Sequence, residues 1–369
     1  LCAVQGCVLS GVQDGQGVIT CSDGSVSSVV MSRRFKPGLV AFGTGRACGV
    51  MLSGRPYCWP DTGVFAGMWG FLPKGDYKKL VVDYDHACGV TTDGKLHCWG
   101  GGNAGDGSGH GKTVVPQGSY QDVAVGQQHT CALRTDGTIV CFGAGTAKKW
   151  QSPHLQQSRP PSGTFASLTC GQWHCCAIAK SSGTVACWGK GKKETTANDD
   201  QGQSLPPTGA FKALALGGQF TCGLRVSGQI ACWGRTYIDG KSVTMPAPVG
   251  SFTSVVVGAW FACGRKTSGQ IVCWGGLTQT ISPAVPAIKY TGSNYTKLAS
   301  SSFNTCALQD GQVRCQGALI YRGHLPAMPA PTGKFQHIYG GGQSRMCAHR
   351  VDGSLVCWGD YKKGGFYTP

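Results

Sequence analysis

Short apolar runs separated by glycine-containing turns recur along the chain. The clearest unit, residues 123–143, holds three such runs; the second contains Cys131, the third contains Cys141, and Thr135-Asp136-Gly137 separates these two. In other units the first run opens with an aromatic residue, as in Phe165–Leu168. Runs of this length between turn residues are typical of β-strands. The pattern predicts an all-β protein built from repeated units.

A pair of cysteines marks each unit, and successive first cysteines lie 40 to 46 residues apart. The first cysteines are Cys7, Cys48, Cys88, Cys131, Cys176, Cys222, Cys263, Cys306 and Cys347. Their partners in the same order are Cys21, Cys58, Cys98, Cys141, Cys187, Cys232, Cys273, Cys315 and Cys357. Small β-units of this kind bury both faces only by stacking on their neighbours. We therefore predict a single closed β-propeller of about nine disulfide-stapled blades over residues 1–369.

Hairpin geometry predicts that the two cysteines of a unit face each other. A three-residue loop at 135–137, closed by glycine in the left-handed region, makes Arg134 and Thr138 the flanking pair. Counting back along both strands sets Cys131 opposite Cys141, at a non-hydrogen-bonded position. There the α-carbons approach to about 4.5 Å, at the close end of the disulfide range.

Units with other spacings fit the same geometry. Cys306 and Cys315 are one residue closer, and their loop, 310–311, has two residues. A loop centred on 13–15 sets Cys7 opposite Cys21. For the Cys176–Cys187 pair we predict a longer loop at 181–183.

Three further cysteines lie outside this pattern. A two-residue turn at 172–173 would set Cys170 opposite Cys175, which predicts a tenth bond. Cys2 has no assigned partner within the chain. We also expect residues 365–367, which resemble the start of a first strand, to complete the first blade.

The segment Ala47–Leu52, followed by Pro56-Tyr57-Cys58-Trp59, resembles the regulator of chromosome condensation repeat superfamily. The disulfide-bearing form is similar to the repeats of crinkly-type plant receptor kinase ectodomains. The resemblance implies a propeller, for which seven blades are the family norm, against nine units here. It implies several functions, because the superfamily includes exchange factors, chromatin binders, bacterial enzyme inhibitors and receptor ectodomains.

Composition indicates an oxidising compartment. The chain has 21 cysteines among 369 residues, and Asn294-Tyr295-Thr296 is a glycosylation sequon. No run of about 18 apolar residues is present, so we expect no transmembrane segment. We expect a secreted or extracellular protein, either an ectodomain or associated with cell wall or matrix.

Catalytic groups are scarce, and we predict no enzymatic activity and no cofactor. Glu194 is the only glutamate, and eight of the sixteen aspartates precede glycine in predicted turns. Residues 105–113 resemble a phosphate loop, but Asp106 stands where glycine is required. His86, His129 and His174 each lie two residues before a repeat cysteine; we expect them to cap or pack the turn before the strand, and we predict no metal site. The tryptophans that follow the second cysteines are predicted core residues: Trp59, Trp99, Trp188, Trp233, Trp274 and Trp358.

The turn before each cysteine strand holds a variable residue, and we place the candidate ligand site there. Trp173, Trp260 and Phe303 would form an apolar arc on one face of the ring, with Asp85 and Gln128 at the same position in other units. Packing onto neighbouring blades is the competing interpretation for these side chains.

The net charge of +16 could attract an acidic polysaccharide, an anionic membrane surface or an acidic protein, and solubility alone is the competing interpretation. Lysines that follow the closing cysteines would share one rim: Lys148, Lys149, Lys190, Lys192, Lys193, Lys362 and Lys363. Candidate partners are an extracellular protein, a peptide or an acidic polysaccharide, with self-assembly as a further candidate and nucleic acid disfavoured. We predict a recognition module that binds peptide or glycan on a blade-turn face. The alternative is a structural subunit of an extracellular matrix or filament.

Overall fold

A computed structural model describes residues 7–13, 16–21, 26–30, 34–43, 46–59, 73–83, 85–101, 110–145, 155–192, 201–238, 241–275, 288–317, 330–342 and 345–359. For residues 7–30 and 236–243 the description covers the backbone alone. The described chain forms 28 strands in nine antiparallel sheets. The predicted all-β class is confirmed. No helix long and apolar enough to cross a membrane occurs among these residues.

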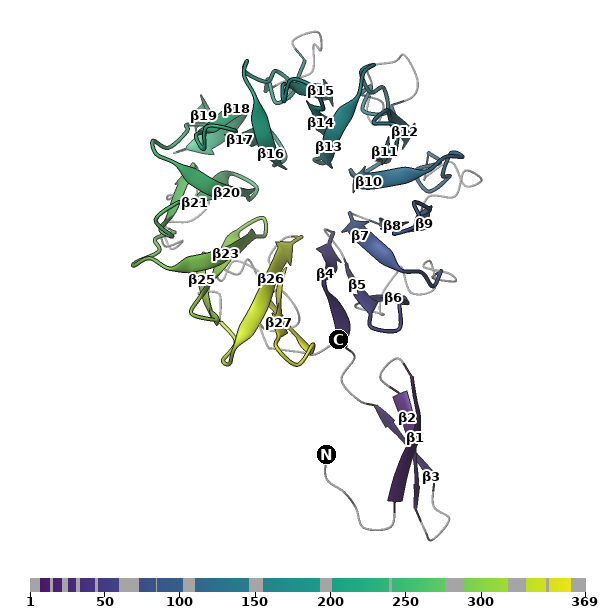
Figure 1. Cartoon of the computed structure of the whole chain (residues 1–369). Helices are drawn as coiled ribbons and strands as arrows, with labels where there is room; N and C mark the ends of the chain where they lie inside the picture. Colours follow the sequence, from purple (N-terminus) through teal and green to yellow (C-terminus); the bar gives the residue numbers. More distant parts are fainter. Residues whose placement is uncertain are drawn as a thin grey trace.

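The first sheet differs from the others in the order of its strands. It consists of β1 (Cys7–Gln13), β2 (Gln16–Cys21) and β3 (Val26–Val30), so its additional strand follows the cysteine hairpin. Figure 1 shows this sheet apart from the rest of the molecule. Residues 365–367, which we expected to complete it, lie outside the described residues.

In the other eight sheets the additional strand precedes the cysteine hairpin. The first strands are β4 (Phe35–Phe42), β7 (Tyr77–Val82), β10 (Tyr120–Val125), β13 (Phe165–Cys170), β16 (Phe211–Leu216), β20 (Phe252–Val257), β23 (Tyr295–Ser300) and β26 (Phe335–Gly341). The middle strands are β5 (Ala47–Met51), β8 (His86–Thr91), β11 (His129–Arg134), β14 (His174–Ala179), β17 (Phe220–Arg225), β21 (Phe261–Lys266), β24 (Asn304–Gln309) and β27 (Arg345–Arg350). The third strands are β6 (Pro56–Trp59), β9 (Leu96–Gly100), β12 (Ile139–Gly143), β15 (Val185–Gly189), β18 (Ile230–Ile238), β22 (Ile271–Gly275), β25 (Gln312–Gly317) and β28 (Leu355–Gly359), and β18 pairs further with β19 (Lys241–Thr244).

These eight sheets are arranged around a ring with their first strands innermost (Figure 1). Each first strand contacts the first strand of the next sheet along the chain, and β26 contacts β4. The arrangement is propeller-like, as the repeat pattern predicted.

A main-chain hydrogen bond recurs where one sheet meets the next. The aromatic residue that opens a first strand donates its N–H to the carbonyl of a hairpin-loop glycine in the preceding sheet. The N···O pairs are Tyr120–Gly94 (2.8 Å), Phe165–Gly137 (2.8 Å), Phe211–Gly183 (2.8 Å), Phe252–Gly228 (2.7 Å), Tyr295–Gly269 (3.2 Å) and Phe335–Gly311 (2.8 Å). The N–H of Phe35 makes the same bond to Gly353, at 3.4 Å, so the last sheet meets β4 as the others meet each other.

The predicted cysteine pairs are joined as expected. Eight repeat disulfides and the Cys170–Cys175 bond are present among the described side chains, with Cα–Cα distances of 4.0 to 4.1 Å. Cys7 lies opposite Cys21 in the register of β1 and β2. The side chains of that pair, and all of Cys2, lie outside the described part.

Turn length follows the cysteine spacing. Arg134 N–H donates to the carbonyl of Thr138 at 2.8 Å, and Gly137 has a φ of 89°, which confirms the three-residue loop. The two-residue loop 310–311 has both residues at positive φ (51° and 75°), as a tight hairpin turn requires.

Two loop predictions need correction. The longer loop begins at Lys180, because Ala179 N–H bonds the carbonyl of Thr184 at 2.8 Å. In the first sheet Gln13 pairs with Gln16, so it belongs to the strand, and an irregularity between Ser10 and Gln13 restores the cysteine register.

The hydrophobic core lies between neighbouring sheets. In one cluster, Leu133 of β11 packs with Leu168 of β13 and Trp188 of β15, which belong to the next sheet. Five of the six repeat tryptophans are buried and Trp274 is half-buried. Inter-blade packing, predicted for these tryptophans, is confirmed for the buried five. Each sheet thus depends on its neighbour for the burial of its apolar face.

Candidate functional site

A cavity of about 880 Å³ lies where the ends of the inner strands converge. Each of the eight ring sheets contributes lining residues from its first strand, among them Phe42, Val82, Val125, Cys170, Leu216, Val257, Ser300 and Gly341. The turns into the middle strands complete the wall. The cavity is therefore a product of the ring as a whole.

Glycine allows neighbouring turns to approach closely at this wall. Gly171 N–H donates to the carbonyl of His174 at 2.8 Å and closes the turn between β13 and β14. A Cβ at Gly171 would lie 2.8 Å from the carbonyl oxygen of Gly217 in the next sheet. A larger residue would force the two turns apart and widen the mouth of the cavity.

The structure brings the three predicted aromatic residues to this cavity. Trp173, Trp260 and Phe303 all line it, and each is half-buried. The rings of Trp260 and Phe303 lie 5.4 Å apart between centroids, tilted by 46°. The packing that we weighed as the competing interpretation is thus present between these two rings, although both still border the cavity. Their role in ligand binding stays a prediction.

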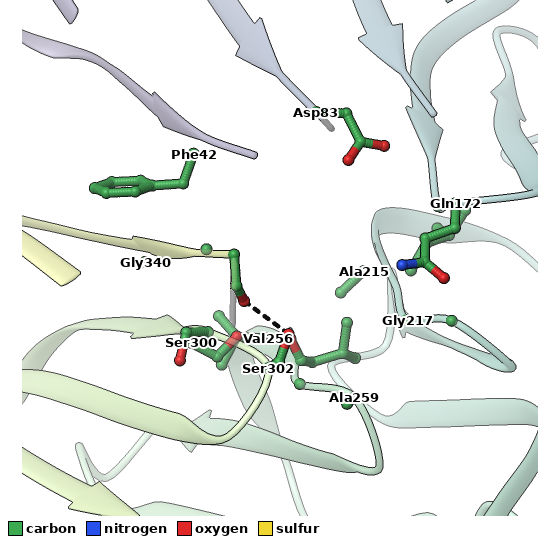
Figure 2. A pocket seen from close by; sticks show the side chains of 18 of the residues that line it. Phe42, Asp83, Gln172, Ala215, Gly217, Val256, Ala259, Ser300, Ser302 and Gly340 are labelled. Carbon is green, nitrogen blue, oxygen red and sulfur yellow. Dashed lines mark hydrogen bonds between the residues drawn. The ribbon is translucent and has the colours of Figure 1, made fainter. Parts of the chain in front are cut away.

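Polar groups on the cavity wall are mostly uncharged. Gln172, exposed at its turn, and Ser302 lie on different sides of the space (Figure 2), and Ser302 Oγ donates to the carbonyl of Gly342 at 2.7 Å. Asp83 and Lys190 are the charged residues among the described lining. The wall therefore offers aromatic surface and amide or hydroxyl groups in preference to charge.

Asp85 and Gln128 do not line the cavity; instead they hold Lys112. The Lys112 ammonium lies 2.7 and 2.9 Å from the two carboxylate oxygens of Asp85 and donates to Gln128 Oε1 at 3.0 Å. Burial opposes ionisation of Asp85, but the contacts of its carboxylate with His86 and Lys112 outweigh it, so the pKa of this carboxyl is lowered.

Lys112 is a residue whose position the sequence did not reveal. Its side chain is fully buried, so it is committed to this internal ion pair and does not face a ligand. The same residue is the lysine of segment 105–113, which resembles a phosphate loop. Asp85 lies 27 positions earlier in the chain and Gln128 lies 16 positions later, and nothing in the sequence around Lys112 indicates either partner.

The histidines are buried and join adjacent sheets. His86 Nε2–H donates to Thr130 Oγ1 at 3.0 Å, and His174 Nε2–H donates to Thr221 Oγ1 at 2.9 Å. His129 makes the equivalent contact to Cys175 Sγ at 3.0 Å. The predicted packing role is confirmed, with the partner in the next sheet. Burial lowers the pKa of His129 and His174 to about 3, so both are neutral at physiological pH.

One cluster has the composition of a metal site. His129 Nε2 and the Sγ atoms of Cys131, Cys170 and Cys175 lie within 4.8 Å of one another. All three cysteines are in disulfides, and a disulfide sulfur is not the thiolate that a zinc site requires.

Few of the predicted basic residues fall in the described chain. Lys190 lines the cavity and Lys192 is half-buried. Lys148, Lys149, Lys193, Lys362 and Lys363 lie outside the described residues. The shared basic rim therefore stays a prediction. Among its described lysines, Lys190 lines the cavity.

The predicted glycosylation site lies on the surface. Asn294 is exposed, has a φ of 67° and immediately precedes β23. An oligosaccharide at this position would meet solvent and not the core.

The ring of stacked three-stranded sheets defines a propeller-like repeat protein. The family model described as Regulator of chromosome condensation (RCC1) repeat matches residues 84–106 and 120–147. No curated protein matches the sequence.

Solved structures share the fold at low sequence identity. The CRINKLY WD40 ectodomain of the Arabidopsis thaliana receptor kinase ACR4 is 21% identical with a TM-score of 0.54, covering 80% of this chain and 99% of that one. The entire ectodomain of the Physcomitrella patens receptor kinase CR4 is 21% identical with a TM-score of 0.52, covering 79% and 76%. Human WBSCR16 is 14% identical with a TM-score of 0.50, covering 78% and 87%. These similarities establish the fold.

Proposed function

We propose that this chain is an extracellular, non-catalytic recognition module whose central cavity binds a glycan or a peptide. The observation that carries the proposal is the convergence of Trp173, Trp260 and Phe303 on one cavity of about 880 Å³. The disulfide in every ring sheet supports an oxidising, extracellular setting. Two of the structures that share the fold are receptor kinase ectodomains, which agrees with that setting.

The lining favours an uncharged ligand segment. Indole and phenyl faces stack on the apolar faces of sugar rings or on side chains of a peptide, while Gln172 and Gln219 offer amide donors and acceptors. A densely anionic ligand would meet Lys190 as the cationic group of the described lining. Acidic polysaccharide is therefore the less favoured member of the predicted partners.

A glycan array and a peptide display library tested on the intact protein would identify the ligand, and calorimetry would measure its affinity. Trp260→Ala and Trp173→Ala should each weaken binding at least tenfold, because each removes an aromatic wall of the cavity. Val249→Ala, at a residue 94% exposed and outside the lining, is the matched control and should leave affinity unchanged. Binding that is insensitive to both tryptophan variants would refute the cavity as the site. Isolation of the native protein as an ordered polymer without ligand would support the matrix-subunit alternative instead.

We further propose that the eight ring sheets close as one propeller and that the β1–β3 sheet lies outside it. The support is the bond from Phe35 N–H to Gly353, together with a β-bridge between Arg34 and Ser354. Amide hydrogen exchange tests it: the Phe35 amide should be protected to the same order as the Phe165 amide, which bonds Gly137 at an internal junction. Exchange of Phe35 at the rate of an open strand edge would show that the ring is not closed there.

A further inference from the structure

The sheet β13–β15 holds two disulfides, whereas each of the other seven ring sheets holds one among the described residues. The additional bond, Cys170–Cys175, links β13 to β14 beside the regular Cys176–Cys187 bond. At the position of Cys175 the sheets on either side have Thr130 and Thr221, each of which accepts a hydrogen bond from a histidine of the preceding sheet. Cys175 therefore occupies a position where the adjacent sheets use a threonine to contact the histidine of the preceding sheet, and they do so without a second disulfide.

Two disulfides of neighbouring sheets meet at this point. Cys175 Sγ lies 3.7 Å from Cys131 Sγ, which is bonded to Cys141 in the preceding sheet. Cys131 and Cys175 are fully buried. Cys170 is half-buried and lines the central cavity. A reagent in the cavity thus reaches Cys170 first, with the other sulfurs behind it.

We propose that Cys170–Cys175 is a thiol-exchange site, which passes a reducing equivalent from a dithiol in the cavity to the Cys131–Cys141 bond. A thiolate of the external dithiol attacks Cys170 Sγ, the Cys170–Cys175 bond breaks, and Cys175 leaves as a thiolate. Cys175 then attacks Cys131 Sγ, forms a Cys131–Cys175 bond and releases Cys141 as a thiolate. The second thiol of the reagent resolves its mixed disulfide with Cys170. The net products are the oxidised dithiol, a new bond between two sheets, and two protein thiols at Cys141 and Cys170.

His129 favours the first step. Its Nε2 lies 3.0 Å from Cys175 Sγ, and a donated N–H stabilises a thiolate there as leaving group. The ring is neutral because burial lowers its pKa to about 3, so the contact is a hydrogen bond and not an ion pair. The exchange does not depend on which ligand the cavity binds.

Limited reduction of the intact oxidised protein by dithiothreitol, followed by an acid quench, alkylation and peptide mapping, tests the proposal. Cys141 and Cys170 should be alkylated together, with a Cys131–Cys175 link recovered, before any label appears on Cys222 or Cys232. Recovery of alkylated Cys170 and Cys175 with the Cys131–Cys141 bond intact would overturn the transfer. Labelling no faster than at Cys222 and Cys232 would overturn the site itself.

The double variant Cys170→Ala/Cys175→Thr is the matched control. It restores the threonine that Thr130 and Thr221 provide in the adjacent sheets and keeps a partner for His129, so the sheet has the means to fold. In this variant Cys141 should be alkylated no faster than Cys232. Rapid labelling of Cys141 without Cys170 and Cys175 would contradict the proposed path.

Discussion

Single buried histidines couple one ring sheet to the next. The imidazole of His174 donates to Thr221, and the hydroxyl of Thr221 in turn donates to the carbonyl of Gln203 at 3.4 Å. This chain satisfies polar groups that the interface would otherwise bury unpaired. The cost is that the imidazole must stay neutral, since a charge there would have no carboxylate partner among the contacts it makes.

Stability is therefore expected to fall on acidification. In the unfolded chain a histidine binds a proton near pH 6.5, whereas His174 in the fold does so near pH 3, so the unfolded state binds more protons between these values. Between pH 7 and pH 5 each such histidine should remove about 2 kcal/mol from the free energy of unfolding. His174→Asn, which introduces the residue that Asn304 provides at the equivalent position, should reduce this pH dependence by about that amount in denaturant titrations.

Thr221→Val provides the control for the histidine prediction. It removes the hydrogen-bond partner but keeps the titrating group, so it should lower stability at both pH values while the dependence on pH remains. If His174→Asn retained the full pH dependence, burial of a neutral His174 would not be its source.

Residue roles could be predicted from the sequence where the signal was periodic. The cysteines, which recur in every unit, and the tryptophans, which recur in six of the nine, were assigned correctly because each occupies one fixed position of the repeat. Asp85 and Gln128 share the turn position of Trp173, yet they face Lys112, which a separate loop brings between them. The turn could be predicted from the sequence, but the position of that loop could not, because its contacts depend on the packing of two sheets.

At the scale of the hairpin, loop length and cysteine spacing act together. A longer loop moves the facing positions apart in sequence, and the disulfides follow, from a separation of 9 for Cys306–Cys315 to 11 for Cys176–Cys187. This coupling let the pairing be predicted from the sequence. The irregular register of β1 and β2 could not be predicted, since a bulge restores facing cysteines with a different loop.

Removal of one repeat disulfide should destabilise the protein without changing its ring. For Cys222→Ala/Cys232→Ala, the loss of a cross-link over 10 residues is expected to lower the free energy of unfolding by about 2–3 kcal/mol. The measurement is chemical denaturation of the oxidised variant against the parent. If the variant lacked the native far-ultraviolet circular dichroism spectrum in the absence of denaturant, this hairpin would need its disulfide to form.

At the scale of the whole molecule, the cysteine pattern predicted nine units, and the described residues form nine sheets, eight of them in the ring. The first unit has the same cysteine pair, but its additional strand, β3, follows the cysteine hairpin, whereas in the ring sheets the additional strand precedes it. Strand order is what allows a first strand to line the ring and to bond the glycine of the preceding sheet. Cysteine spacing does not depend on that order. The number of units could therefore be predicted from the sequence, but which units form the ring could not.

The proposed ring depends on covalent linkage of neighbouring strands within each unit. Peptide mapping of the unreduced protein from an oxidising host tests this most directly. We predict bonds between Cys7 and Cys21, between Cys170 and Cys175, and between the two cysteines of each ring unit. Free thiols at the repeat positions, or bonds that join different units in untreated protein, would contradict the stapled ring and the extracellular setting proposed for it.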